Sequence, residues 1–202
     1  MRYLSVMKAW TRLHNSFAAA VLPMMLCIGL SAAAIVAAGP AFGQTAKLDE
    51  LFDKLKSADP AQAGRIEQEI WIEWSKSGSA AMDLLLQRGR QAMSEGNFAL
   101  AVEHFTALID HAPEFAEGWN ARATAYYQMG QIGPSMADIA QTLRLNPRHF
   151  GALSGFAMIL EELDRPKQAL ELRRAVQAIH PHAAGVSQAI DRLEADLQGS
   201  SL

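Results

Sequence analysis

Three prolines, Pro113, Pro147 and Pro181, stand 34 residues apart, and the residues between them recur in the same register. Small residues return seven and nineteen positions after the start of each unit, and Gly96 and Gly130 fall near the middle of the first two units. Two antiparallel helices approach closely only where both present small side chains, and proline after the second helix stops it. The spacing therefore predicts three helix pairs that bury their apolar faces by stacking on one another.

The register divides the middle of the chain into three units. These units are 82–115, 116–149 and 150–182. Within them we expect helices near 83–95, 98–111, 117–129, 132–145, 152–163 and 166–179. Because all six segments are helical, the predicted fold class is all-α.

The recurring positions resemble those of the tetratricopeptide repeat (TPR) family. The matching residues are Trp119, Ala123, Tyr126, Gly130 and Pro147 in the second unit, Leu85, Gly89, Gly96, Ala101, Phe105 and Pro113 in the first, and Leu153, Ala157, Ala169 and Pro181 in the third. The third unit has Arg173 where a large apolar residue is usual, which suggests a more exposed edge there. The resemblance implies a right-handed α-solenoid of three TPR helix pairs that binds other proteins and is not an enzyme.

The C-terminal end of such a solenoid exposes an apolar face that needs cover. Residues 183–202 carry an apolar stripe at helical spacing, formed by Val186, Ile190, Leu193 and Leu197. The stripe predicts a capping helix near 184–197. The alternative is a helix reserved for a partner protein.

The segment 44–81 carries two further apolar stripes, separated by a loop with Asp59 and Pro60. It predicts a helical hairpin that caps the first unit. Whether Trp71 and Trp74 in its second stripe are core residues or an exposed anchor stays open, because tryptophan is also enriched at interfaces.

The first 43 residues predict an export signal. Arg2, Lys8 and Arg12 form a positive start, and residues 17–38 carry no charge. Small residues before Gln44 place the cleavage site there. We expect a periplasmic protein of the bacterial cell envelope; the alternative is an uncleaved inner-membrane anchor facing the periplasm, the chain's one expected contact with a membrane.

In the TPR family, the first helices of successive repeats line a groove that accepts an extended peptide or a short helix. Carried over by repeat position, this resemblance gives nine candidate groove residues. They are Leu86, Arg90, Met93, Asn120, Thr124, Tyr127, Ser154, Met158 and Glu161.

Some TPR cochaperones hold a partner's C-terminal carboxylate between lysine, asparagine and arginine residues of the groove. The comparable positions here include Leu86, Thr124, Ser154 and Met158, so that clamp is missing. We therefore expect a guest held by apolar and backbone contacts rather than by its terminal acid.

Other function classes find little support in the sequence. The chain after residue 43 carries 15 basic and 21 acidic residues, so it lacks the positive surface that nucleic acids require. Cys27 is the only cysteine, and no catalytic, phosphate-binding or cofactor motif occurs. We predict no metal, no cofactor and no enzyme activity.

The leading hypothesis is an interaction scaffold that binds a protein partner, whose identity the sequence does not give. One alternative is a structural factor that acts by self-association through its ends or its groove. Another is an enzyme subunit with its site in the hairpin around Trp71 and Trp74, supported only by the lack of a match there.

Overall fold

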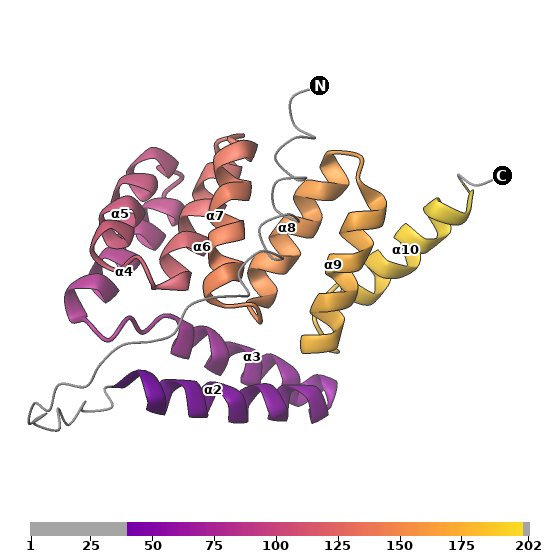
Figure 1. Ribbon diagram of the computed structural model, residues 1–202, viewed down its shortest axis with the longest axis horizontal. Coiled ribbons are helices and arrows are strands. Elements are labelled where there is room, and N and C mark those ends of the chain that lie inside the picture. Colours follow the sequence, from indigo (N-terminus) through magenta and orange to yellow (C-terminus); the bar gives the residue numbers. More distant parts are fainter. Residues whose placement is uncertain (1–39, 200–202) are drawn as a thin grey trace, which may run out of the picture. The chain divides into compact units, whose positions relative to one another are not determined.

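The computed structural model describes residues 40–199, and the side chains of residues 46–198. Residues 1–39 of the predicted export signal lie outside the described residues. The described part consists of helices joined by short turns (Figure 1). The helices are α2 (Pro40–Ser57), α3 (Pro60–Trp74), α4 (Ala80–Ser94), α5 (Phe98–His111), α6 (Ala116–Gln128), α7 (Ile132–Leu145), α8 (Phe150–Glu162), α9 (Pro166–Ile179) and α10 (Val186–Gly199). Among these described helices, none combines the length and the apolar character needed to cross a membrane.

The repeat units form three helix pairs, α4 with α5, α6 with α7 and α8 with α9, and neighbouring pairs pack on each other. Gly96 and Gly130 turn the chain inside the first two pairs with φ of 73° and 71°, a left-handed conformation that favours glycine. In the third pair Asp164 adopts the same conformation, with φ of 55°. The proline and glycine spacing thus corresponds to one helix pair per unit.

Three predicted helices, 98–111, 132–145 and 166–179, coincide with α5, α7 and α9 residue for residue. The first helix of each pair begins one to three residues earlier and ends one residue earlier than predicted. In α8 the reason is a cap: the side chain of His149 accepts a hydrogen bond from the backbone N–H of Ala152, so the helix begins at Phe150.

Gly89 marks the closest approach of α4 and α5. A Cβ at this position would lie 2.2 Å from a ring carbon of Phe105, which is fully buried. Gly89→Ala is therefore expected to lower the free energy of unfolding by about 1–3 kcal/mol, as overpacked core substitutions do. At Gly64 in α3 a Cβ meets nothing within 4 Å, so Gly64→Ala should raise it by up to about 1 kcal/mol. Chemical denaturation measures both, and equal effects would contradict the close contact.

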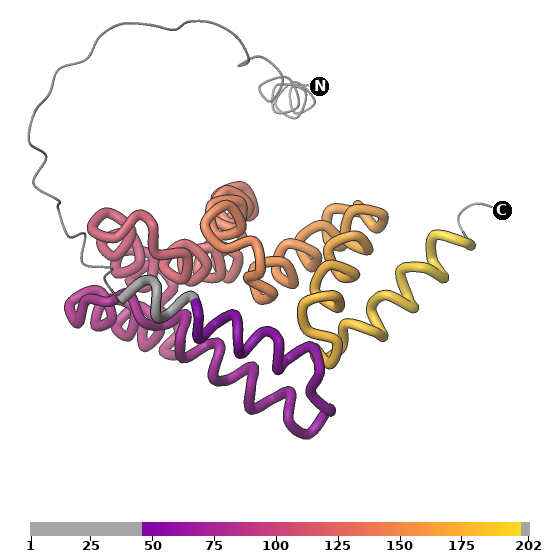
Figure 2. Tube along the Cα trace, turned by 60° about the horizontal axis from the view of Figure 1, so that its bottom comes forward, coloured from indigo at the N-terminus to yellow at the C-terminus, as the bar shows by residue number. Residues whose placement is uncertain are grey.

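The α2–α3 hairpin packs against the third helix pair, so the prediction that it caps the first unit is wrong. Figures 1 and 2 show the hairpin running across the ends of the repeat helices. Its buried residues belong to the same core cluster as residues of α8 and α9: Leu51, Phe52, Leu55, Ile70 and Trp74 with Phe150, Leu153, Leu170 and Val176. The turn from Ser75 to Ser79 redirects the chain, and Gly78 adopts φ of 84° within it.

The first helix pair needs no hairpin to cover it, because its outer face is largely polar. The exposed positions of α4 include Leu84, Gln87, Arg88 and Gln91. Thirty-four residues later, three of these positions are Gly118, Ala121 and Ala125, all buried. At two of these three positions the first unit carries glutamine where the second unit packs on its neighbour, and Leu84 is the one exposed apolar residue among them, so solvent covers that face at little cost.

At the other end, α10 packs along α9 through the predicted stripe, with Val186, Ile190 and Leu193 buried. The expected exposed edge at Arg173 is wrong. Its side chain is only 16% exposed and donates to Glu161, which also accepts from Arg192 of α10. The charge at this position is accommodated by an ion-pair network beneath the last helix.

Candidate functional site

A hollow of about 110 Å³ lies between the first helices of the second and third pairs. We call it the α6–α8 hollow. It brings together four of the nine predicted groove residues: Asn120, Thr124, Tyr127 and Met158. Side chains that the sequence assigned to a groove in two different repeat units therefore lie around one depression.

The inner part of the α6–α8 hollow is mostly apolar, with the buried hydroxyl of Ser135 hydrogen-bonded to the backbone of Ala123, and its outer part offers hydrogen bonds. Ala123, Ile139 and Ile159 line it and are buried. Asn120 donates one N–H to Glu117 at 3.2 Å, and among the described residues no hydrogen bond uses its side-chain carbonyl oxygen. The hydroxyl of Thr124 donates to the backbone carbonyl of Asn120 at 3.0 Å, which leaves its lone pairs to accept.

The outer end of the α6–α8 hollow is closed by a contact between the two helices. The hydroxyl of Tyr127 donates a hydrogen bond to the carboxylate of Glu162. This hydrogen bond, together with the nearby negative charge, raises the pKa of Tyr127 above its ordinary value. Tyr127 therefore stays a neutral donor, fixed as one wall of the hollow.

Leu86 does not line a groove, and its assignment as a groove residue is wrong. Its side chain is 2% exposed and packs in one cluster with Ala121 and Ala125 of α6. These two alanines leave room next to α4, and the larger leucine fills it. Met93 is half-buried against the same cluster.

Arg90 and Glu161 are occupied by contacts within the protein. Arg90 donates to the hydroxyl of Ser75 at 2.9 Å and to Glu117 at 2.6 Å. Glu161 accepts from Arg173 and Arg192. Ser154 is half-buried on α8 and does not line the α6–α8 hollow.

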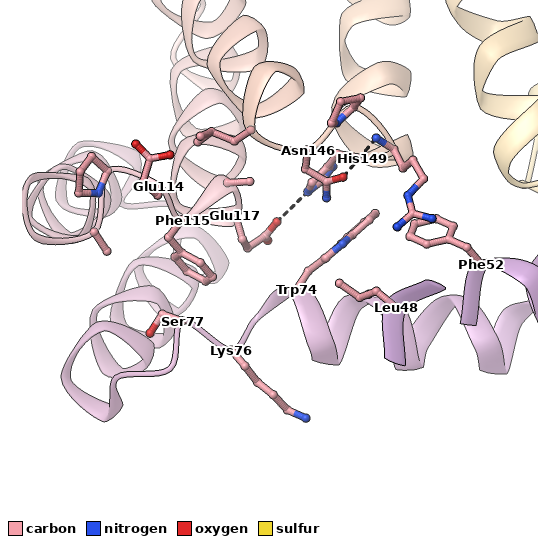
Figure 3. Close-up of a pocket in the computed structure, with 16 residues that line it drawn as sticks. Leu48, Phe52, Trp74, Lys76, Ser77, Glu114, Phe115, Glu117, Asn146 and His149 are labelled. Atoms are coloured by element: carbon pink, nitrogen blue, oxygen red, sulfur yellow. Dashed lines mark hydrogen bonds and ion pairs between the residues drawn. The ribbon is translucent and has the colours of Figure 1, made fainter. Parts of the chain in front are cut away.

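A larger cleft, of about 740 Å³, lies where the hairpin meets the turns between helix pairs (Figure 3). Its apolar and aromatic lining comes from Leu48, Phe52, Trp74, Phe115 and His149, among others. Arg148 places its guanidinium 4.3 Å from the centre of the Phe52 ring and pairs with Asp49. In Figure 3 the side chain of Lys76 points away from the cleft.

Glu117 is a buried carboxylate that connects all three helix pairs. It is 4% exposed, accepts from Arg90 of α4, and lies 3.0 Å from Nε2 of His149 at the start of α8 (Figure 3). Nδ1 of His149 accepts from the backbone N–H of Ala152, so Nε2 carries the proton and donates to Glu117. Among the described residues, the carboxylate accepts hydrogen bonds from α4, from Asn120 of its own helix and from the start of α8.

The imidazole of His149 also holds the hairpin. It stacks on Trp74 with ring centres 4.2 Å apart and planes 12° apart, and Trp71 meets it edge-on at 5.5 Å. Trp74 is 6% exposed and Trp71 is half-buried. Of the two interpretations left open by the sequence, the structure supports core aromatics, which join the hairpin to the third helix pair.

Comparison with known proteins decides the family. No family model matches the chain. A TPR repeat-containing protein of Rhizobium etli is 37% identical over 155 residues, which make up 76% of this chain and 76% of that relative. The chain belongs to the TPR repeat proteins. Such proteins are usually non-catalytic interaction modules.

Solved TPR structures share the fold. The first TPR domain of Spaghetti (RPAP3), bound to an HSP90 peptide, aligns with a TM-score of 0.55 at 18% identity, covering 58% of this chain and 93% of that one. The TPR2B domain of yeast Sti1, in a complex with an Hsp70 peptide, gives 0.53 at 20% identity, covering 58% and 99%. MamA gives 0.52 at 17%, covering 75% and 81%. At these identities the likeness concerns the fold alone.

The resemblance to TPR repeats did not predict several residues that line the α6–α8 hollow. Gly151 and Gly155 contribute bare backbone to it, and Gln128 lines its outer part. The two glycines could have been found from the sequence, because they stand in the first helix of a repeat where other units carry side chains. Within the described residues, no group of three potential metal ligands occurs.

The hairpin of this TPR protein contains its own buried charge, Glu73. Its side chain is 6% exposed and pairs with Lys47 at 2.5 Å and Lys76 at 2.7 Å. Hydrogen bonds from Lys47 and then Lys76 lower the pKa of Glu73 below its ordinary 4.5. The pairing therefore stabilises the fold above the pKa of the unfolded chain, and this stability is lost as the pH falls through the lower folded-state pKa.

We accordingly expect the free energy of unfolding to fall more steeply below about pH 4.5 in the natural chain than in Glu73→Gln. Denaturant titrations at a series of pH values measure the two slopes. Glu69→Gln, which removes an exposed carboxylate from the same helix, is the control. Identical slopes for the natural chain and Glu73→Gln would show that the pairing does not set the acid sensitivity.

Proposed function

We propose that this TPR protein is a non-catalytic interaction protein whose α6–α8 hollow binds a segment of a partner protein. The observation that carries the proposal is the convergence of Asn120, Thr124, Tyr127 and Met158 on one depression with an apolar interior. Apolar interiors with a few placed hydrogen-bonding groups are typical of binding sites. The RPAP3 and Sti1 domains, whose structures contain bound chaperone peptides, support this use of the fold.

In the proposed complex, a side chain of the guest enters the hollow between α6 and α8. The exposed Met158 covers it, since a thioether adapts to irregular shapes. Asn120 accepts through its side-chain carbonyl oxygen and donates its second N–H to the guest backbone, and Thr124 accepts through its hydroxyl oxygen. The three helix pairs act as one right-handed solenoid that holds α6 and α8 at a fixed spacing.

A photo-crosslinking amino acid in place of the exposed Thr124 tests the proposal in cells. We expect it to capture a protein partner, and the same group in place of Glu103, exposed on α5, to capture none. Gly155→Leu fills the hollow and should abolish the capture from position 124. Capture that persists in Gly155→Leu would contradict binding in the hollow, and capture of a second copy of this chain would favour the self-associating structural factor instead.

We further propose that the protein works in the bacterial cell envelope. The positive start of the chain and the uncharged residues 17–38 support export. N-terminal sequencing of the protein from a periplasmic fraction should give a chain that begins at Gln44. A chain that retains Met1 in the membrane fraction would favour the anchored form, and one confined to the cytoplasm would contradict export.

A further inference from the structure

We infer that the guest of the α6–α8 hollow is a basic-aliphatic segment: one branched aliphatic side chain that enters the hollow, with a lysine or arginine nearby. This inference rests on the proposed function of the hollow. It is carried by two features, the electrostatics of the hollow's outer end and the size of its interior.

The outer end of the hollow is negative because two helices terminate there. The contact between Tyr127 and Glu162 brings the last turns of α6 and α8 together. A helix C-terminus carries the equivalent of about half a negative charge on its free carbonyl groups. Neither α6 nor α8 has a basic residue in its last turn to offset it.

Glu162 adds a full negative charge to this end. It is exposed, and among the described residues it accepts from Tyr127 but has no ion pair with a lysine or arginine. Its neighbour Glu161, by contrast, pairs with both Arg173 and Arg192. A carboxylate at a helix C-terminus is unfavourable, so a cation supplied by a guest would stabilise both Glu162 and the helix ends.

The interior of the hollow limits the size of the guest side chain that enters it. At about 110 Å³ it is smaller than pockets that enclose a whole ligand, so it takes one side chain. Its buried lining includes Ala123, Ile139 and Ile159, and the hydroxyl of the buried Ser135 already donates its proton to the backbone carbonyl of Ala123 at 2.8 Å, which favours an aliphatic side chain. A Cβ added at Gly155 would meet nothing within 4 Å, so the glycine leaves this space open.

Selection of a random dodecapeptide phage library on the full chain tests the inference. We expect enriched peptides to combine a valine, leucine or isoleucine with a nearby lysine or arginine. Synthetic copies should bind Gly155→Leu at least about tenfold more weakly, because the filled hollow can no longer bury their aliphatic side chain. They should bind Glu162→Gln about threefold more weakly and with less dependence on salt.

Two matched variants control for general effects: Gly64→Leu, which also adds a side chain at an open helical glycine, and Glu114→Gln, which removes another exposed carboxylate. Neither should change binding. The enriched peptides could instead be acidic or uncharged, and lose binding in Gly155→Leu but not in Glu162→Gln. That result would overturn the inferred guest and leave the proposed function standing. Failure to enrich any peptide that Gly155→Leu releases would overturn both.

Discussion

Replacing Trp74 with alanine should lower the free energy of unfolding by about 3–5 kcal/mol, as truncation of a buried aromatic residue does. The side chain is 6% exposed and contacts four rings, those of Phe52, Trp71, His149 and Phe150, at centroid distances between 4.2 and 6.0 Å. These rings come from α2, α3 and the start of α8. The loss therefore affects the joint between hairpin and third helix pair, and denaturant titration measures it.

The same substitution should free the hairpin before the repeats unfold. Trypsin cleavage at Lys76, in the turn that connects α3 to α4, reports this release. Ile72→Ala on the same helix is the control, because Ile72 is 51% exposed and should change stability by less than about 0.5 kcal/mol. If both variants lost equal stability, or if cleavage at Lys76 did not accelerate in Trp74→Ala, the hairpin would not be held by this joint.

The repeat helices could be predicted from the sequence because their determinants are local. Proline after each second helix and a glycine or aspartate in each turn fix where the chain reverses, and α5, α7 and α9 have the predicted bounds. The position of the hairpin depends on distant residues. The stripe that carries Trp71 and Trp74 indicates a buried helix face, but nothing in it says that the face meets His149 and Phe150.

The candidate site could be predicted only where one repeat resembles the next. Asn120, Thr124, Tyr127 and Met158 follow from the register and line one hollow. Leu86 occupies a corresponding position yet is buried, because α6 offers alanines beside it. Gly155 is recognisable in the sequence as a glycine where the other two units have Gln87 and Ala121, but the sequence does not indicate that the space it leaves belongs to the hollow.

Glu117 connects the α6–α8 hollow with the contact between the hairpin and the third helix pair. It accepts a hydrogen bond from Asn120, which lines the hollow. It also accepts one from His149, whose imidazole stacks on Trp74. Among the described residues, Arg90 is the one arginine or lysine that forms an ion pair with Glu117, and it also donates to Ser75 at the end of α3. The carboxylate therefore fixes the spacing of α4, α6 and α8. It also fixes the position of the hairpin against the third helix pair.

Glu117→Ala should accordingly lower the free energy of unfolding by about 2–4 kcal/mol, because it leaves the donors of Arg90 and His149 without their acceptor. The half-exposed Arg90 regains some solvation, which keeps the loss below that of a fully buried pair. Denaturant titration measures the effect, with Glu114→Gln as an exposed control expected to stay within about 0.5 kcal/mol.

Glu117→Gln is the sharper variant, because it preserves shape and removes only charge and one acceptor. The glutamine NH2 group would face either Arg90 or the Nε2–H of His149. Both of these groups are donors, so that contact could not form a hydrogen bond. His149 cannot exchange tautomers without losing the bond that its Nδ1 accepts from Ala152 at the start of α8. We therefore expect a loss of about 1–3 kcal/mol from Glu117→Gln as well. A neutral outcome would mean that shape alone, and not the carboxylate with its donors, holds the three helix pairs in register.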